Sequence, residues 1–144
     1  MSLVLDASLT LAWYFEDEAS PTADSLLAVV TRRGAVVPPL WRLEAVNGLQ
    51  SAIRRNRIDK RYRDDYLADL RLLPIETDGE CEARVWSSTL RLADRFGLSV
   101  YHACYLELAQ RRDLPLATLD AACVPQPTPW ASRRRRSEAA RPPT

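Results

Sequence analysis

The sequence predicts an α/β fold in which a mostly parallel central sheet is covered by helices on both faces. Short β-type runs alternate with longer helical patterns along the 144 residues, which is the order typical of a parallel sheet. The first run, at 2–6, is almost continuously apolar, as expected for a strand buried on both faces. The length suits one domain with one hydrophobic core.

Each element follows from a local pattern. Strands are expected where short apolar runs are bounded by turn or helix signals: 2–6, 35–38, 74–77 and 114–120. Helices are expected where apolar residues recur every three or four positions: 7–15, 20–34, 39–56, 59–73, 79–97 and 99–113. Ser20, Asp59 and Ser99 are the expected N-caps, and Gly34 and Gly97 the expected helix ends.

The charge is unevenly distributed. The net charge is +1, but the segment from Ala131 onward, with four consecutive arginines, carries +4 and leaves −3 for the rest. Five prolines follow Asp120 without apolar periodicity, so we expect a domain over 1–124 and a Pro/Arg-rich irregular tail over 125–144. This distribution of charge neither excludes RNA as a partner nor establishes it.

The sequence also favours a cytoplasmic protein without a membrane partner. The amino terminus lacks a basic region and includes Asp6, which argues against a signal peptide. The apolar runs are too short to span a bilayer. The three cysteines, Cys81, Cys104 and Cys123, are an odd number without CxxC spacing. They predict neither a disulfide framework nor a zinc site, and a reducing compartment fits them best.

Three acids are expected at one edge of the sheet. Asp6 ends the first strand, Asp120 ends the last, and Glu44 lies one turn into the helix after the second strand. Carboxylates with room for water suit Mg²⁺ or Mn²⁺, which can activate water and neutralise charge on a phosphodiester. The alternative is that each strand-end Asp caps the next helix. A phosphatase of the Asp-x-Asp type is disfavoured, because "DAS" at 6–8 lacks the second Asp.

The order of three motifs resembles the PIN-domain ribonucleases, and most closely the VapC-type toxins. They are "VLDAS" (4–8), "PPLWRLEAVNGL" (38–49) and "GLSVYHACYLELAQRRDLPLATLD" (97–120). The resemblance implies a PIN-like three-layer α/β/α sandwich and a Mg²⁺- or Mn²⁺-dependent endoribonuclease. It also implies a cognate VapB-type antitoxin and a homodimer. Matched position by position, Asp6, Glu44 and Asp120 are three of the four family acids.

Three further residues are candidate supports of this site. Ser8 and Thr118 match hydroxyls of the family, although Ser8 also fits a helix N-cap and Thr118 an ordinary strand residue. Asn47 lies one turn after Glu44 on the same helix face, and it is more diagnostic because a buried amide needs a partner. We expect Leu43 and Val46 in the core, facing away from the metal together with Trp41, while Glu44 points into the cleft.

The only histidine, His102, stands where the family has its fourth acid. It could act as a metal ligand that favours Mn²⁺ or Zn²⁺, it could weaken metal binding by removing a negative charge, or it could have no role. Weakened binding is favoured, because Mg²⁺ gains little from nitrogen. Glu107 is a poor substitute, since five positions rotate it by about 140° around the helix.

The main interpretation is therefore a VapC-like metal-dependent endoribonuclease that hydrolyses RNA phosphodiesters and is weakened by His102. The rival is a catalytically silent PIN-fold module that binds antitoxin or RNA without cleaving. After Asp120, the family's usual helix and final strand are replaced by the Pro/Arg-rich tail. That tail is either a truncated or out-of-register ending, or a natural arm that contacts RNA phosphates.

Overall fold

A computed structural model describes residues 2–119 and shows a sheet of four strands, all paired in parallel. The strand order is β3-β2-β1-β4. The strands are β1 (Leu3–Leu5), β2 (Ala35–Val37), β3 (Ile75–Thr77) and β4 (Leu116–Ala117). The predicted α/β class is confirmed, and each observed strand lies inside the range expected for it.

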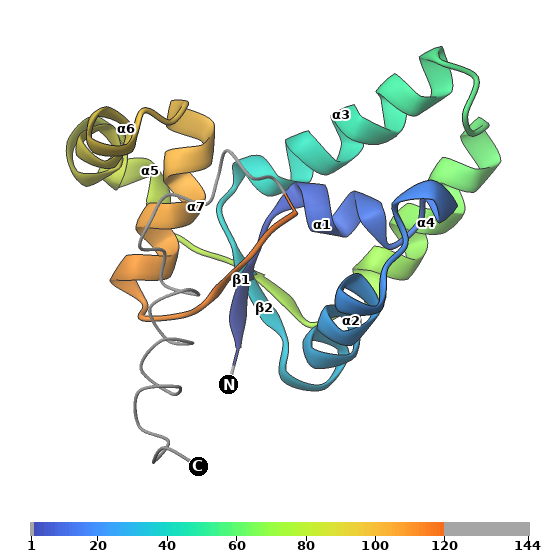
Figure 1. Cartoon of the computed structure of the whole chain (residues 1–144), viewed down its shortest axis with the longest axis horizontal. Coiled ribbons are helices and arrows are strands. Elements are labelled where there is room, and N and C mark those ends of the chain that lie inside the picture. Colours follow the sequence, from blue (N-terminus) through green and yellow to red (C-terminus); the bar gives the residue numbers. More distant parts are fainter. Residues whose placement is uncertain (1, 120–144) are drawn as a thin grey trace, which may run out of the picture.

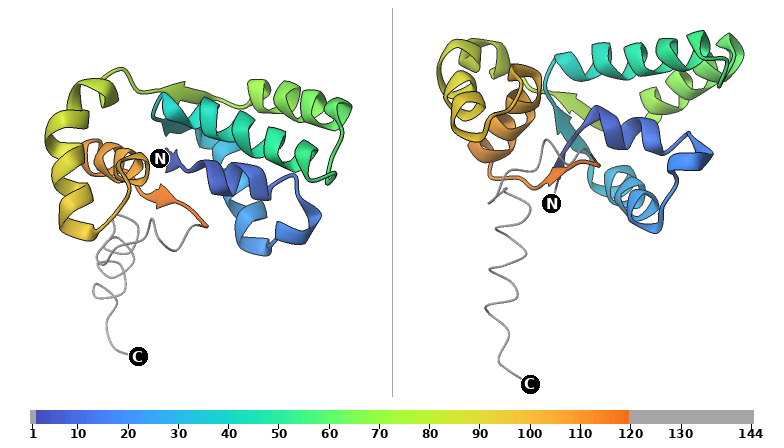
Figure 2. Two further views of the ribbon diagram at one scale, coloured as in Figure 1. Left: turned by 90° about the horizontal axis from the view of Figure 1, so that it is seen from above. Right: turned by 45° about the horizontal axis from the view of Figure 1, so that its top comes forward.

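Helices cover both faces of the sheet, so the described part of the chain has three layers (Figures 1 and 2). On one face lie α1 (Ala7–Ala12), the 3₁₀ turn η1 (Glu16–Glu18), α2 (Pro21–Arg33), α3 (Leu40–Arg54) and α4 (Lys60–Leu72). On the other face lie α5 (Cys81–Arg84), the π-helical turn η2 (Val85–Thr89), α6 (Leu90–Phe96) and α7 (Val100–Arg111). The single helix expected at 79–97 therefore contains a π-helical turn.

The expected N-caps are confirmed. The side chains of Ser20, Asp59 and Ser99 each accept a hydrogen bond from the backbone N–H three residues further on. Gly97 ends α6 in the left-handed region, at φ 64°. These polar side chains satisfy helix N–H groups that have no partner inside the helix, so the sequence marks the helix starts locally.

The apolar stripe expected on α3 is wrong at two positions. Leu43 and Val46 are 74% and 40% exposed, whereas the buried side chains of α3 are Trp41, Ala45, Leu49 and Ala52. Small residues explain the difference, because they allow α1 and α3 to pack closely. A Cβ on Gly48 would lie only 2.3 Å from Leu11 of α1. The buried face of α3 therefore combines Trp41 and Leu49 with the small residues Ala45 and Ala52.

A buried ionic cluster joins α7 to the end of β3. We call Asp78, Glu107, Arg111 and Arg112 the Asp78 cluster. Asp78 is 1% exposed, and its carboxylate lies 2.8 Å from nitrogens of both arginines. Glu107 also pairs with Arg111 at 2.8 Å. Glu107 is therefore engaged in this cluster, which agrees with the expectation that it does not substitute for the acid missing at position 102.

Electrostatics keep Asp78 ionised. Burial raises the pKa of Asp78, but hydrogen bonds from Arg111, the Glu80 backbone, Cys81 and Arg112 outweigh burial and hold that pKa well below its ordinary value. In return, hydrogen bonds to Asp78 and Glu107 raise the pKa of Arg111. The charged pair is the stable form, and removing either partner would leave an uncompensated buried charge.

Candidate active site

The strand order places β1 at the point where the chain connections change direction across the sheet. The strands β2 and β4 lie on opposite sides of β1. In parallel α/β sheets, ligands bind at the carboxyl ends of neighbouring strands whose following connections run in opposite directions. Asp6 directly follows β1, and Thr118 directly follows β4. The starts of α1, α3 and α7 lie at the same edge (Figure 1). Residues far apart in the sequence are therefore brought to one place.

Asp6 is held by hydroxyl groups from the segments that follow β1 and β4. Its side chain is 4% exposed, and its Oδ2 accepts hydrogen bonds from Ser8 Oγ, at 2.9 Å, and from Thr118 Oγ1. The two hydroxyl oxygens lie 3.4 Å apart. Asp6 does not cap α1 with its side chain, and Ser8 lies inside α1 rather than before it. These contacts oppose the helix-cap alternatives and agree with supporting roles for Ser8 and Thr118.

Glu44 is positioned by a tyrosine from the opposite layer. Glu44 lies in the second turn of α3 and is half-buried, and its Oε1 accepts a hydrogen bond of 2.6 Å from the Tyr105 hydroxyl. The Tyr105 side chain of α7 is fully buried. Burial raises the pKa of Tyr105, as do the hydrogen bond to Glu44 and the negative charges of Glu44 and Asp6. Tyr105 therefore stays protonated at neutral pH and remains a hydrogen-bond donor to Glu44.

Sequence reasoning missed Tyr105. The available signal was its spacing, because residue 105 lies three positions after His102 and so shares its helix face. A tyrosine in an apolar helix is ordinarily a core residue, and the sequence does not show which carboxylate its hydroxyl meets. The partner is 61 residues away, and only the packing of α7 beside α3 reveals it.

The structure places the other candidate residues differently from one another. His102 is half-buried in the first turn of α7, at the same sheet edge. Asn47 is exposed, so the expectation of a buried amide is wrong; the α3 face after Glu44 is open to solvent. Asp120 lies outside the described residues. Within 2–119, no group of three or more His, Cys, Asp or Glu side chains is placed to hold a metal ion.

The donor set of this site fits a hard divalent cation. Hydroxyl donors engage Oδ2 of Asp6, while within residues 2–119 Oδ1 accepts no hydrogen bond. Glu44 adds a second carboxylate near the same buried tyrosine. Oxygen ligands of this kind are those that Mg²⁺ and Mn²⁺ prefer. Fold and site together define an α/β protein that collects carboxylates at the carboxyl edge of its sheet.

Comparison with known proteins gives the family. The PIN domain pattern matches residues 3–123, and the chain belongs to the PIN domain family, generally a nuclease fold that uses divalent metal ions. The crystal structure of PAE2754 from Pyrobaculum aerophilum superposes with a TM-score of 0.65 at 21% identity, covering 98% of this chain and 97% of that one. No curated protein sequence matches. Among the described helices, none has the length and apolarity needed to cross a bilayer.

Replacing Tyr105 by Phe should weaken the site without unfolding the protein. The variant loses a hydrogen bond to a charged acceptor, which costs about 1.5–3 kcal/mol when the acceptor is buried and less for half-buried Glu44. We expect roughly tenfold weaker Mn²⁺ binding, because Glu44 is no longer held in place. Calorimetric titration with Mn²⁺ and urea unfolding measure the two effects. The control is Tyr101→Phe, whose side chain is 67% exposed; equal losses in both variants would contradict a positioning role for Tyr105.

Proposed function

We propose that this protein is a VapC-like, metal-dependent endoribonuclease in which Asp6, Glu44 and Asp120 hold Mg²⁺ or Mn²⁺. The observation that supports this proposal most is the pattern of hydrogen bonds made to the Asp6 carboxylate. Two hydroxyls from segments 110 residues apart converge on Oδ2 of this buried carboxylate and leave Oδ1 to a ligand. The buried carboxylate of Asp78, by contrast, is paired with a cation of the chain.

The residues of the site have separate tasks in this proposal. Ser8 and Thr118 orient the Asp6 carboxylate by hydrogen bonding, and Tyr105 orients the carboxylate of Glu44. A bound divalent cation supplies Lewis-acid polarisation of the phosphate and lowers the pKa of a coordinated water. The arrangement keeps the carboxylates ionised and fixed before the substrate arrives, so little reorganisation is needed during hydrolysis.

The proposal includes partners and a location. Among the described residues, several large apolar side chains on different helical elements are strongly exposed; examples are Leu43, Leu72, Trp86 and Tyr101. We assign such surface to a VapB-type antitoxin and to a second copy of the chain. Free, buried Cys81 and Cys104 suit a cytoplasmic location.

The second candidate function, a silent PIN-fold module, is favoured by the imidazole of His102 at the position of an acid.

Cleavage of RNA by the wild-type chain and by His102→Asp, each with and without Mn²⁺ or Mg²⁺, tests the proposal. We expect weak metal-dependent cleavage by the wild type and at least about tenfold faster cleavage by His102→Asp, because a negative charge returns to the site. Tyr101→Asp is the control, since it adds the same charge to the same helical turn at an exposed position. Cleavage by neither protein would favour the silent module, and equal rates would remove the role given to His102.

A further inference from the structure

We propose that the turn between α3 and α4 binds phosphates of the RNA backbone and holds the substrate strand that leads to the Asp6 site. The residues are Arg54, Arg55, Lys60 and Arg61, which we call the hairpin basic cluster. This inference rests on the proposed function, because it assigns RNA as the ligand. It adds a binding surface outside the carboxylate site, at the far end of the helix that carries Glu44 (Figure 1).

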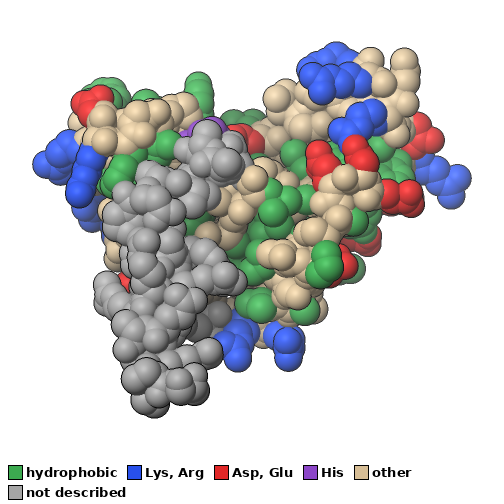
Figure 3. Space-filling model, viewed as in Figure 1, with side chains coloured by type: hydrophobic (Ala, Val, Ile, Leu, Met, Phe, Trp, Pro, Cys, Tyr) green, Lys and Arg blue, Asp and Glu red, His purple; other side chains and the backbone are tan. Residues whose placement is uncertain are grey.

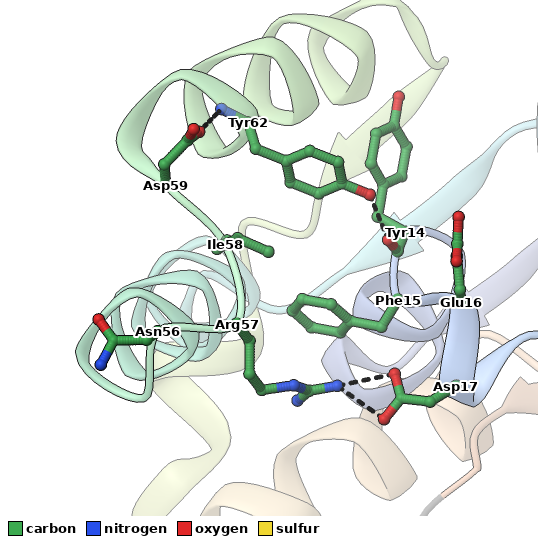
Figure 4. Close-up of a pocket in the computed structure, with 9 residues that line it drawn as sticks. All are labelled: Tyr14, Phe15, Glu16, Asp17, Asn56, Arg57, Ile58, Asp59 and Tyr62. Atoms are coloured by element: carbon green, nitrogen blue, oxygen red, sulfur yellow. Dashed lines mark hydrogen bonds and ion pairs between the residues drawn. The ribbon is translucent and has the colours of Figure 1, made fainter.

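The hairpin basic cluster has positive charge that the fold does not use. Residues 54–63 contain six basic side chains and one acid, Asp59. Arg57 is engaged, because it binds both carboxylate oxygens of Asp17, at 2.8 and 2.9 Å, and lies 4.4 Å from the centre of the Phe15 ring (Figure 4). Arg63 is engaged by Asp64 and Gln50. These two arginines are structural and are not assigned to RNA.

The remaining four basic residues are exposed and available. The guanidinium of Arg54 contacts the Ser51 hydroxyl at 3.1 Å. No carboxylate within residues 2–119 pairs with Arg55, Lys60 or Arg61, whereas Arg57 and Arg63 nearby do have such partners. Basic side chains gather over this end of the molecule in the space-filling view (Figure 3). Exposed cations without acidic partners can neutralise phosphates at little desolvation cost.

A hollow connects this cluster with the candidate active site. Its volume is about 650 Å³, and its lining includes Ser8 and Leu119 beside the site and Arg55 and Arg57 beside the hairpin. One acid, Glu18, also lines it. Ser8 donates to Asp6 and accepts from the backbone of Leu119, so this end of the hollow lies against the candidate metal ligands. A strand placed in the hollow would meet Arg55 of the hairpin basic cluster at one end and Ser8, the hydrogen-bond donor to Asp6, at the other.

The dimensions suit a short stretch of RNA. Glu44 and Arg55 are eleven residues apart on α3, which corresponds to about 16 Å along the helix. A stacked strand with a rise of about 3.4 Å per nucleotide spans that distance in roughly five nucleotides. The neighbouring hollow of about 870 Å³ is larger but lined by Glu16, Asp17 and Asp59, and its arginine is already paired (Figure 4). Its charge does not favour phosphate.

The test is the salt dependence of RNA binding by the full-length chain. Fluorescence anisotropy of an end-labelled single-stranded RNA is followed in EDTA over a series of NaCl concentrations, so that no cleavage occurs. The variant Arg55→Ala/Arg61→Ala is compared with Arg32→Ala/Arg33→Ala, in which two exposed arginines are removed from the last turn of α2. Arg55→Lys/Arg61→Lys preserves the charge and controls for folding.

Each phosphate of a single strand that the protein no longer neutralises reduces the magnitude of the negative slope of log K against log salt by about 0.7. We therefore expect Arg55→Ala/Arg61→Ala to make this slope less negative by about 1.4 and to lower affinity by at least about tenfold in 0.1 M salt. The α2 variant and the lysine variant should stay close to wild type. The reduction in affinity should be similar for RNAs of different sequence, because phosphate contacts carry no base information.

Two outcomes would overturn the inference: equal reductions in affinity in the hairpin and α2 variants, or no reduction in the hairpin variant. Cleavage is measured separately with Mn²⁺. Cleavage without hairpin-dependent binding would remove this inference and leave the proposed function standing. Hairpin-dependent binding without any cleavage would support the inference and remove the hydrolytic activity. The two proposals can therefore fail independently.

Discussion

Replacing Asp6 by Asn should lower metal-dependent RNA cleavage by about 10²–10³-fold, the usual cost of removing one well-placed polar group from a catalytic site. Mn²⁺ affinity should fall as well, because the variant loses a charged oxygen ligand. The fold should persist, since no cation of the described chain pairs with this carboxylate. Initial cleavage rates, Mn²⁺ titration and urea unfolding together measure these effects. Asp120→Asn should have the same consequences for cleavage and binding.

The matched control is Asp24→Asn, which removes an exposed carboxylate from the first turn of α2. It removes one negative charge, as Asp6→Asn does, but lies outside the candidate site. Cleavage by this control should equal that of the wild type. If Asp6→Asn cleaves RNA as fast as the wild type does, the carboxylate site is assigned to the wrong residues.

Replacing Asp78 by Asn should reduce the free energy of unfolding by about 3–5 kcal/mol, the usual cost of removing one partner from a buried ion pair. Arg111 and Arg112 would then lose the carboxylate that lies 2.8 Å from each of them. Urea unfolding at neutral pH measures this reduction. Asp17→Asn is the control, because the Arg57–Asp17 pair is exposed, with side chains 34% and 71% accessible, and such pairs contribute about 0–1 kcal/mol.

The same residue predicts a pH dependence. The native pKa of Asp78 is lowered, so the unfolded chain, with a carboxyl pKa of about 3.9, takes up protons first as the pH falls. The stabilisation from Asp78 is therefore complete above about pH 4–5 and decreases as the pH falls through and below 3.9. Asp78→Asn should show a smaller decrease over this acid range. Parallel acid-unfolding curves for the two proteins would contradict the account of the cluster.

Local patterns predict much of this fold, because strands and helix starts depend on neighbouring residues. The N-caps at Ser20, Asp59 and Ser99 form as expected. The buried face of α3 was mispredicted, since its burial depends on the close approach of α1 at Gly48 rather than on the size of its own apolar residues. Which face of a helix is buried depends on how two helices pack together, so the sequence of one helix alone does not reveal it.

The candidate site was predictable to a smaller extent. Strand ends and the family resemblance together point to Asp6 and Glu44, and the structure puts hydrogen-bond donors on both. Tyr105 was not predictable, because its role depends on an acceptor in another layer. The Asp78 cluster was also missed, since Asp78 pairs with arginines 33 and 34 positions further along the chain. Asp120 remains a prediction from the sequence.

The pairing of β4 with β1 also sets when, during synthesis, the site can form. Thr118 reaches Asp6 only after the last described strand has paired with the first, and 112 residues separate the two side chains. At about 5–20 residues per second, a ribosome needs roughly 6 to 22 seconds to add that many residues. The nascent chain therefore carries an incomplete Asp6 site for most of its translation, and the site is completed only when the last described strand pairs with the first.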